Sequence, residues 1–226
     1  AFSDGLFSDT DCNCSQEQSF DASGLYAIPG LVDIHFHGCM GHDFCDGTPE
    51  AIHHLATYEA SVGVTSICPA TMTVSEENLT QVMRSARTYN EAELPSEEAA
   101  FVGINMEGPF ISESKKGAQA SEHIRRCDSA FFEKLQHTSG GLIKLVDIAP
   151  EEDGALPFIQ QQKENVTISI AHSAATYEEA DAAFQAGVRH VTHLYNAMTP
   201  FSHRNPGIVG AAFDNKHVNV ELICDG

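Results

Sequence analysis

Residues 31–37, LVDIHFH, form the stretch that decides the fold. Its first four residues are mostly apolar, as expected for a short buried strand, and two histidines follow with one residue between them. Side chains two positions apart on a strand point to the same side, so both imidazoles can face one point in space. The stretch therefore predicts a strand that delivers two histidines to a binding site.

Further short apolar runs recur along the chain, and each is a candidate strand. With residues 31–34 they make seven, the others being 64–68, 101–105, 142–146, 166–170, 189–192 and 218–223. Helical stretches lie between them, and two of these follow Ser75 and Thr176, which are residue types that cap helix N-termini well. The alternation is typical of a parallel sheet whose strands are joined by crossover helices.

Seven strands in this rhythm favour an α/β fold of the (β/α)8 TIM-barrel type over an open sheet. A complete barrel typically needs about 250 residues, and residue 226 follows closely on the seventh predicted strand. We therefore expect residues 27–226 to form barrel strands one to seven, incomplete at the C-terminus. Residues 1–26 are polar and irregular, and we interpret them as the remnant of a small β domain.

Composition limits the possible partners and the cellular location. The net charge of −20 disfavours nucleic acid and anionic membranes as partners, although a few local cations can still bind a small phosphorylated molecule. No apolar run reaches the length of a membrane span, and the first residues lack the pattern of a signal peptide. The seven cysteines show no paired spacing, which suits a reducing compartment. These features together predict a cytoplasmic protein.

Histidines and carboxylates stand at the ends of the predicted strands. They are His35 and His37 after the first strand, Glu107 after the third, His172 after the fifth, His193 after the sixth and Asp225 after the seventh. The carboxyl ends of the strands in a parallel barrel all open on one face, so these side chains should converge there. Imidazole and carboxylate groups suit Zn²⁺ and other first-row divalent metals. The pattern therefore predicts a divalent-metal site.

Two further polar residues on these strands are expected outside the metal site. Asp33 precedes His35 on the same strand, and we expect it to support the site or the fold rather than to react. His190 begins the sixth strand, which would place it at the opposite end of the barrel from the ligands.

Longer motifs surround the candidate ligands. They are PGLVDIHFHG at 29–38, NMEGPF at 105–110, AHS at 171–173, THLYNAM at 192–198, HRNPG at 203–207 and DG at 225–226. In these motifs, residues 27–226 resemble the N-acetylglucosamine-6-phosphate deacetylase family of the amidohydrolase superfamily. The resemblance implies a metal-dependent hydrolase barrel that cleaves the acetamide of N-acetylglucosamine 6-phosphate to glucosamine 6-phosphate and acetate, a step in amino-sugar catabolism.

The resemblance also implies roles for individual residues. Glu107, His172 and His193 match the principal metal ligands, while His35 and His37 match a second metal position, so one or two ions of zinc or iron are implied. The implied substrate-binding residues are Ala118, Gln119, Asn196, Ala197, Arg204, Asp225 and Gly226, with Arg204 on the phosphate. Family members are commonly dimers, which implies a homodimer. The catalytic aspartate of the family ends an eighth strand and is expected beyond Gly226, so we assign no catalytic residue and expect the chain by itself to be poorly active.

Other interpretations of the same residues remain. Another deacetylase of the amidohydrolase superfamily would usually bridge its metals with a carboxylated lysine, but Lys144 lies in the middle of its predicted strand. A non-catalytic protein that binds sugar phosphates would keep the same metal ligands. A purely structural zinc protein would instead favour a closed, cysteine-rich site.

Overall fold

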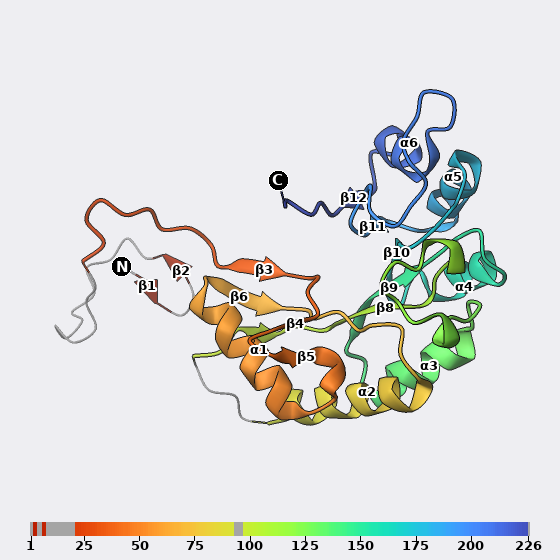
Figure 1. The fold of residues 1–226 in the computed structure, drawn as a ribbon. Helices are drawn as coiled ribbons and strands as arrows, with labels where there is room; N and C mark the ends of the chain where they lie inside the picture. The colour runs from red at the N-terminus through yellow and green to blue at the C-terminus, as the bar shows by residue number, and fades with distance from the viewer. Residues whose placement is uncertain (1, 4–5, 8–20, 93–96, 226) are drawn as a thin grey trace.

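The computed structural model describes residues 2–3, 6–7, 21–92 and 97–225. Near the N-terminus, β1 (Phe2–Ser3) pairs antiparallel with β2 (Leu6–Phe7). Figure 1 shows this pair apart from the remaining strands. The division into a small N-terminal domain and a barrel from residue 27 stays a prediction.

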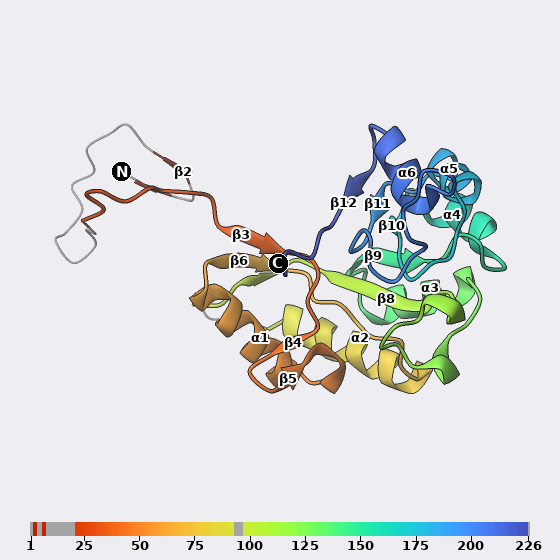
Figure 2. The same cartoon turned by 45° about the horizontal axis from the view of Figure 1, so that its top comes forward.

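The remaining long-range pairing is parallel and follows chain order. The first sheet contains β3 (Leu31–Asp33), β6 (Val64–Ile67) and β7 (Ala100–Phe101); the second contains β8 (Ile104–Phe110), β9 (Ile143–Ile148), β10 (Thr167–Ile170), β11 (His190–Val191) and β12 (Asn219–Val220). A parallel bridge between Ala70 and Asn105 connects the two sheets. Figure 2 shows β8 to β12 following one another in a curved row. The arrangement is that of an incomplete TIM barrel, as predicted.

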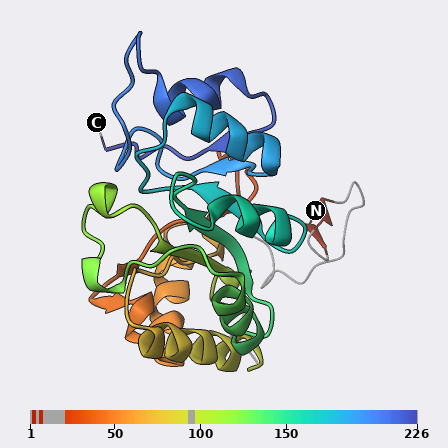
Figure 3. The same cartoon turned by 90° about the vertical axis from the view of Figure 1, so that its right-hand side faces the viewer.

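Helices cover the outside of these strands (Figure 3). They are α1 (Pro49–Ser61), α2 (Glu76–Asn90), α3 (Ser129–Thr138), α4 (Ala155–Gln162), α5 (Tyr177–Ala186) and α6 (Gly207–Asp214), and each contacts the next one along the chain. The predicted caps are present, since the side chains of Ser75 and Thr176 accept hydrogen bonds from the backbone N–H of Asn78 and Glu179. Fully buried side chains such as Ile104, Ile148 and Ile170 form the core between the layers.

The third predicted strand needs a correction. Residues 101–105 were expected to be continuous, but β7 ends at Phe101 and pairs with β6, while β8 begins at Ile104 and pairs with β9. Gly103 lies at this step, where a Cβ atom would meet the side chain of Lys144. Glu107 was predicted to follow the end of the third strand. In the structure it lies inside β8, whose seven residues are all buried.

The connections beyond β3 and β8 are irregular and contain only short elements. A hairpin of β4 (Gly38–Cys39) and β5 (His42–Asp43) follows the HxH segment, and η2 (Phe44–Asp46) continues it. Two further single turns, η3 (Glu113–Lys115) and η4 (Ser121–His123), lie after β8. None of the helices in the described ranges has both the length and the apolar character needed to cross a membrane.

Candidate metal centre

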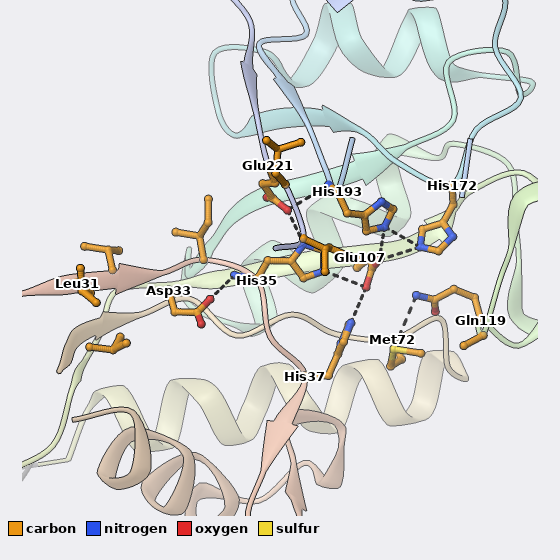
Figure 4. Close-up of a pocket in the computed structure, with 16 residues that line it drawn as sticks. Leu31, Asp33, His35, His37, Met72, Glu107, Gln119, His172, His193 and Glu221 are labelled. Atoms are coloured by element: carbon orange, nitrogen blue, oxygen red, sulfur yellow. Dashed lines mark hydrogen bonds and ion pairs between the residues drawn. The ribbon is translucent and has the colours of Figure 1, made fainter. Parts of the chain in front are cut away.

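The carboxylate of Glu107 is the centre of the site (Figure 4). It is only 2% exposed, and its two oxygens face two pairs of imidazoles. Oε1 lies 2.8 Å from Nε2 of His172 and 3.3 Å from Nε2 of His193. Oε2 lies 2.9 Å from Nε2 of His37 and 3.5 Å from Nε2 of His35. One carboxylate therefore joins two groups of candidate metal ligands.

The ends of three strands position these side chains. His35 and His37 follow β3, His172 follows β10 and His193 follows β11. The last two have positive φ angles, 46° for His172 and 32° for His193, which non-glycine residues rarely adopt. Two more residues with positive φ follow His193 in the loop after β11, Tyr195 with a φ of 79° and Ala197 with a φ of 51°. The backbone thus turns sharply at the places where the ligands leave the sheet.

In three of the four rings, a contact at Nδ1 directs Nε2 toward Glu107, where a metal ion would bind. Nδ1 of His172 lies 2.9 Å from the carbonyl oxygen of Lys115, and Nδ1 of His37 lies 3.2 Å from that of Ala70. Because a carbonyl oxygen only accepts, Nδ1 must carry the proton in both rings. Nδ1 of His35 likewise faces a carboxylate oxygen of Glu221, at 2.6 Å. Metal-binding histidines are typically oriented in this way.

The electrostatics of the site favour a cation beside Glu107. Burial alone would lower the pKa of His35, but hydrogen bonds to Glu107 and Glu221 outweigh it and raise the pKa to about 11. The pKa of His172 is also raised, since contact with Glu107 outweighs burial. Burial would raise the pKa of Glu107, yet the four surrounding imidazoles hold it far below its usual range. Positive charge is therefore strongly favoured here, and a divalent ion supplies it without protonating the rings.

The donor set fits a metal ion. The ligand atoms of His35, His37 and Glu107 lie within 4.8 Å of one another, and so do those of Glu107, His172 and His193. Oε2 of Glu107 and Nδ1 of His193 are buried without a hydrogen bond. Oε2 is thus a buried carboxylate oxygen beside the imidazoles of His35 and His37, and an ion between these groups would satisfy it.

A cavity of about 890 Å³ opens over this centre. Its lining includes all five candidate ligands together with Ala118, Gln119 and Glu221. The side chain of Gln119 is buried, and its Oε1 accepts a 2.6 Å hydrogen bond from the backbone N–H of Thr73. This bond fixes the amide so that its Nε2 lies 3.7 Å from Sδ of Met72, which also lines the cavity.

A model of the Amidohydrolase family matches residues 26–222. The chain belongs to the amidohydrolase family. The sequence is 40% identical over 201 residues to the N-acetylglucosamine-6-phosphate deacetylase of Bacillus subtilis (strain 168), covering 88% of this chain and 51% of that protein. It is 36% identical over 199 residues to the N-acetylgalactosamine-6-phosphate deacetylase of Escherichia coli O157:H7, covering 88% of this chain and 52% of that protein.

Solved structures agree with this membership. The N-acetyl-D-glucosamine-6-phosphate deacetylase of Mycobacterium smegmatis superposes with a TM-score of 0.82 at 32% identity, covering 88% of this chain and 51% of that one. The deacetylase of Thermotoga maritima gives a TM-score of 0.76, also at 32% identity, over 88% of this chain and 52% of that one. This amidohydrolase chain thus spans about half the length of the relatives it matches.

The other predicted site residues of this amidohydrolase lie outside the lining of the cavity. Asn196 is exposed, and its backbone N–H donates to the carbonyl oxygen of His193 at 2.9 Å. The carbonyl oxygen of Ala197 accepts from the N–H of Ser173 at 3.1 Å. Arg204 is exposed and lines a separate cavity of about 380 Å³, and Asp225 is exposed after β12. Gly226 lies outside the described residues.

The sequence analysis missed three residues of this amidohydrolase centre. Glu221 contacts His35 directly, and Asp147 is completely buried with its Oδ1 accepting a 2.8 Å hydrogen bond from Thr192 Oγ1. Burial and the nearby charge of Glu107 raise the pKa of Asp147. His190 was expected far from the ligands, but its Nε2 lies 3.6 Å from Oε1 of Glu221. Asp147 directly follows the fourth predicted strand, a placement like that of the ligands, and this signal could have found it.

Proposed function

We propose that this chain provides the metal-binding part of an enzyme that hydrolyses the acetamide of N-acetylglucosamine 6-phosphate to glucosamine 6-phosphate and acetate. The observation that supports this most directly is the buried carboxylate of Glu107, flanked by two histidine pairs on the wall of a cavity of about 890 Å³. Cavities of this size hold ligands as large as a sugar phosphate. A variant of the similar protein from Mycobacterium smegmatis has been solved in complex with N-acetyl-D-glucosamine-6-phosphate.

The geometry of the site supports the proposed metal ligands. Glu107, His172 and His193 would hold one ion, and Glu107 with His35 and His37 would hold a second. We propose zinc or iron, because imidazole and carboxylate ligands suit both. When bound, such an ion would polarise the acetyl carbonyl and lower the pKa of a water molecule.

The remaining residues of the chain would bind and orient the substrate. Gln119 and Ala118 line the cavity beside the metal ligands, so the fixed amide of Gln119 would direct the acetamide toward the ions. Arg204, with Asn196 and Ala197, would hold the phosphate, since a guanidinium binds phosphate oxygens with paired charge-assisted hydrogen bonds. Asp225 and Gly226 would begin a further substrate-binding segment.

Proton transfer sets the expected activity of the chain by itself. A carboxylate must accept the proton of the attacking water and deliver it to the leaving amine. Glu107 is surrounded by imidazoles and Glu221 is engaged with His35, so neither is available for this step. In line with the resemblance to the deacetylase family, we propose that a carboxylate beyond Gly226 performs it, and we expect slow turnover by these 226 residues. We further propose a homodimer in the cytoplasm.

The test measures acetate release and ligand binding with the metal-loaded chain. We expect metal-dependent binding of N-acetylglucosamine 6-phosphate, slow release of acetate, and weaker binding of unphosphorylated N-acetylglucosamine. Failure to bind the phosphorylated sugar under metal saturation would contradict the proposal. Binding without cleavage, even in a longer protein that contains this chain, would favour a non-catalytic sugar-phosphate sensor.

A second substrate has specific support. The N-acetylgalactosamine-6-phosphate deacetylase of Escherichia coli O157:H7 is 36% identical to this chain, close to the value for the glucosamine enzyme of Bacillus subtilis. The two sugars differ in the configuration of a single hydroxyl group. A direct comparison of acetate release from both sugar phosphates decides between them.

A further inference from the structure

Glu221 follows β12, and backbone hydrogen bonds hold it in place. Its N–H donates to the carbonyl oxygen of Val191 at 2.9 Å, and its own carbonyl oxygen accepts from the N–H of Leu194 at 2.9 Å. Both partners belong to β11 or to the loop that carries His193. The carboxylate therefore leaves the backbone from a fixed position, and it is only 15% exposed.

This carboxylate faces the more exposed half of the metal centre. Oε2 of Glu221 lies 2.6 Å from Nδ1 of His35, although the two residues are 186 positions apart (Figure 4). His35 lies two residues beyond the end of β3, and its contact with Glu221 sets the orientation of its ring. With Nδ1 bound to Glu221, Nε2 of His35 points toward Oε2 of Glu107, 3.5 Å away.

The Nδ1 partner of His35 differs in kind from those of His172 and His37. His172 and His37 use backbone carbonyl oxygens, whereas His35 uses an acidic side chain. A carboxylate partner both fixes the tautomer of an imidazole and raises its basicity as a metal ligand. The contact with Glu221 would therefore favour metal binding at the more exposed position, where burial of the ligands contributes less to the affinity.

Glu221 also contacts the interior and the other metal position. Its Oε1 lies 3.6 Å from Nε2 of His190, whose Nδ1 is 3.0 Å from the hydroxyl of Ser169, a buried residue. Its Oε2 accepts a 3.4 Å hydrogen bond from the backbone N–H of His193. The carboxylate of Glu221 thus lies between the backbone of His193, which belongs to the first metal position, and the ring of His35, which belongs to the second.

We propose that Glu221 is a positioning residue that fixes His35, with Nδ1 protonated and Nε2 free, for the second metal ion. The inference rests on the proposed metal centre. Nε2 of His190 lies beside Glu221. The side chains of Glu107, His172 and His193 make their hydrogen bonds with one another or with Lys115 and not with Glu221, so we expect them to bind the first ion without it. Loss of the Glu221 carboxylate should therefore weaken the binding of the second ion alone, whereas a general loss of structure would weaken the binding of both.

The test titrates the metal-free chain with Zn²⁺ in competition with a chelator and counts bound ions by mass spectrometry. The parent chain should bind two ions. E221Q should bind the first with unchanged affinity and the second about 10–100-fold more weakly, the usual effect of losing such a partner. E164Q, which removes the same charge from an exposed loop residue, should bind both ions like the parent.

The possible outcomes distinguish failure of the inference about Glu221 from failure of the proposed function. E221Q that binds both ions with parental affinity, or loses both together, overturns the inference, and so does a parent chain that binds a single ion. If the circular dichroism of E221Q shows a lost fold, E221D replaces it, because the shortened carboxylate no longer reaches His35 and the same selective loss is expected. Acetate release, measured separately, decides the proposed function whichever way the ion count falls.

Discussion

The two candidate metal positions share Glu107 but differ in how the fold supports them. In the first, Glu107, His172 and His193 lie on or directly after β8, β10 and β11, strands of one sheet, and each side chain is at most 10% exposed. In the second, His35 and His37 follow β3 in the other sheet, and their side chains are 15% and 34% exposed. Hydrogen bonds from neighbouring segments orient rings in both positions, so the difference lies in the burial, which supports the first position more than the second.

Replacement of the shared ligand should abolish both positions. Glu107→Gln keeps the shape of the side chain but removes the charge that balances two cations. We expect both ions to be lost, each with a larger drop in affinity than the roughly 10–100-fold caused by losing an outer partner. Metal counting after gel filtration measures this. Retention of either ion would show that the positions do not share Glu107.

Removal of metal should lower the thermal stability. An ion that binds only the folded chain at about 1,000 times its Kd stabilises it by about 4 kcal/mol. For a chain of this size that corresponds to a melting temperature about 8–16 °C higher. Calorimetry before and after dialysis against a chelator, followed by addition of Zn²⁺, measures the change. The Glu107→Gln variant is the control and should not respond to the chelator.

Single histidine replacements should distinguish the two positions. His172→Ala should remove the buried ion, and His37→Ala should remove only the more exposed one, so each variant keeps one equivalent of metal. Because β8 to β11 supply the first position, we expect the ion that remains in His37→Ala to be the tighter one. Chelator competition ranks the two affinities. Loss of both ions from His37→Ala would mean that the positions are not separable.

Replacement of Arg204 should leave both metal positions intact. It lies in a separate cavity, outside the residues that line the metal site. Arg204→Ala should weaken binding of N-acetylglucosamine 6-phosphate about tenfold, the effect of losing a charge-assisted hydrogen bond, with an unchanged metal content. Calorimetric titration measures the affinity, and Lys216→Ala, which removes an exposed cation elsewhere, is the matched control. An equal loss in both variants would indicate a general charge effect.

Much of the fold was predictable because local sequence determines it. Apolar runs gave the barrel strands in their correct order, and Ser75 and Thr176 marked two helix starts. The step at Gly103 was not predictable, since it depends on Lys144 across the sheet. Helices α4 and α6 were also missed. Helix α6 is apolar on nearly every face and shows no clear periodicity, so the pattern could not distinguish it from a strand or a buried loop.

In the site, too, local sequence predicted some residues, while others depend on tertiary structure. The convergence of His35, His37, Glu107, His172 and His193 was predictable from their places near the ends of parallel strands. Glu221 was not, because a carboxylate inside a predicted strand reads equally well as a surface residue. Its role depends on how β12 and the loop after β11 are aligned, which is a tertiary property.

The left-handed residues after β10 and β11 set ligand geometry against the stability of the fold. His172, His193, Tyr195 and Ala197 each hold a conformation that costs of order 1–3 kcal/mol when the residue is not glycine. Ala197→Gly should therefore raise the free energy of unfolding by about 0.5–1 kcal/mol in a urea titration. Ala183→Gly, the same change within α5, should lower it by about 1 kcal/mol. Glycine would relieve this strain but could not supply an imidazole, so at His172 and His193 the chain holds its metal-binding geometry at the expense of resistance to unfolding.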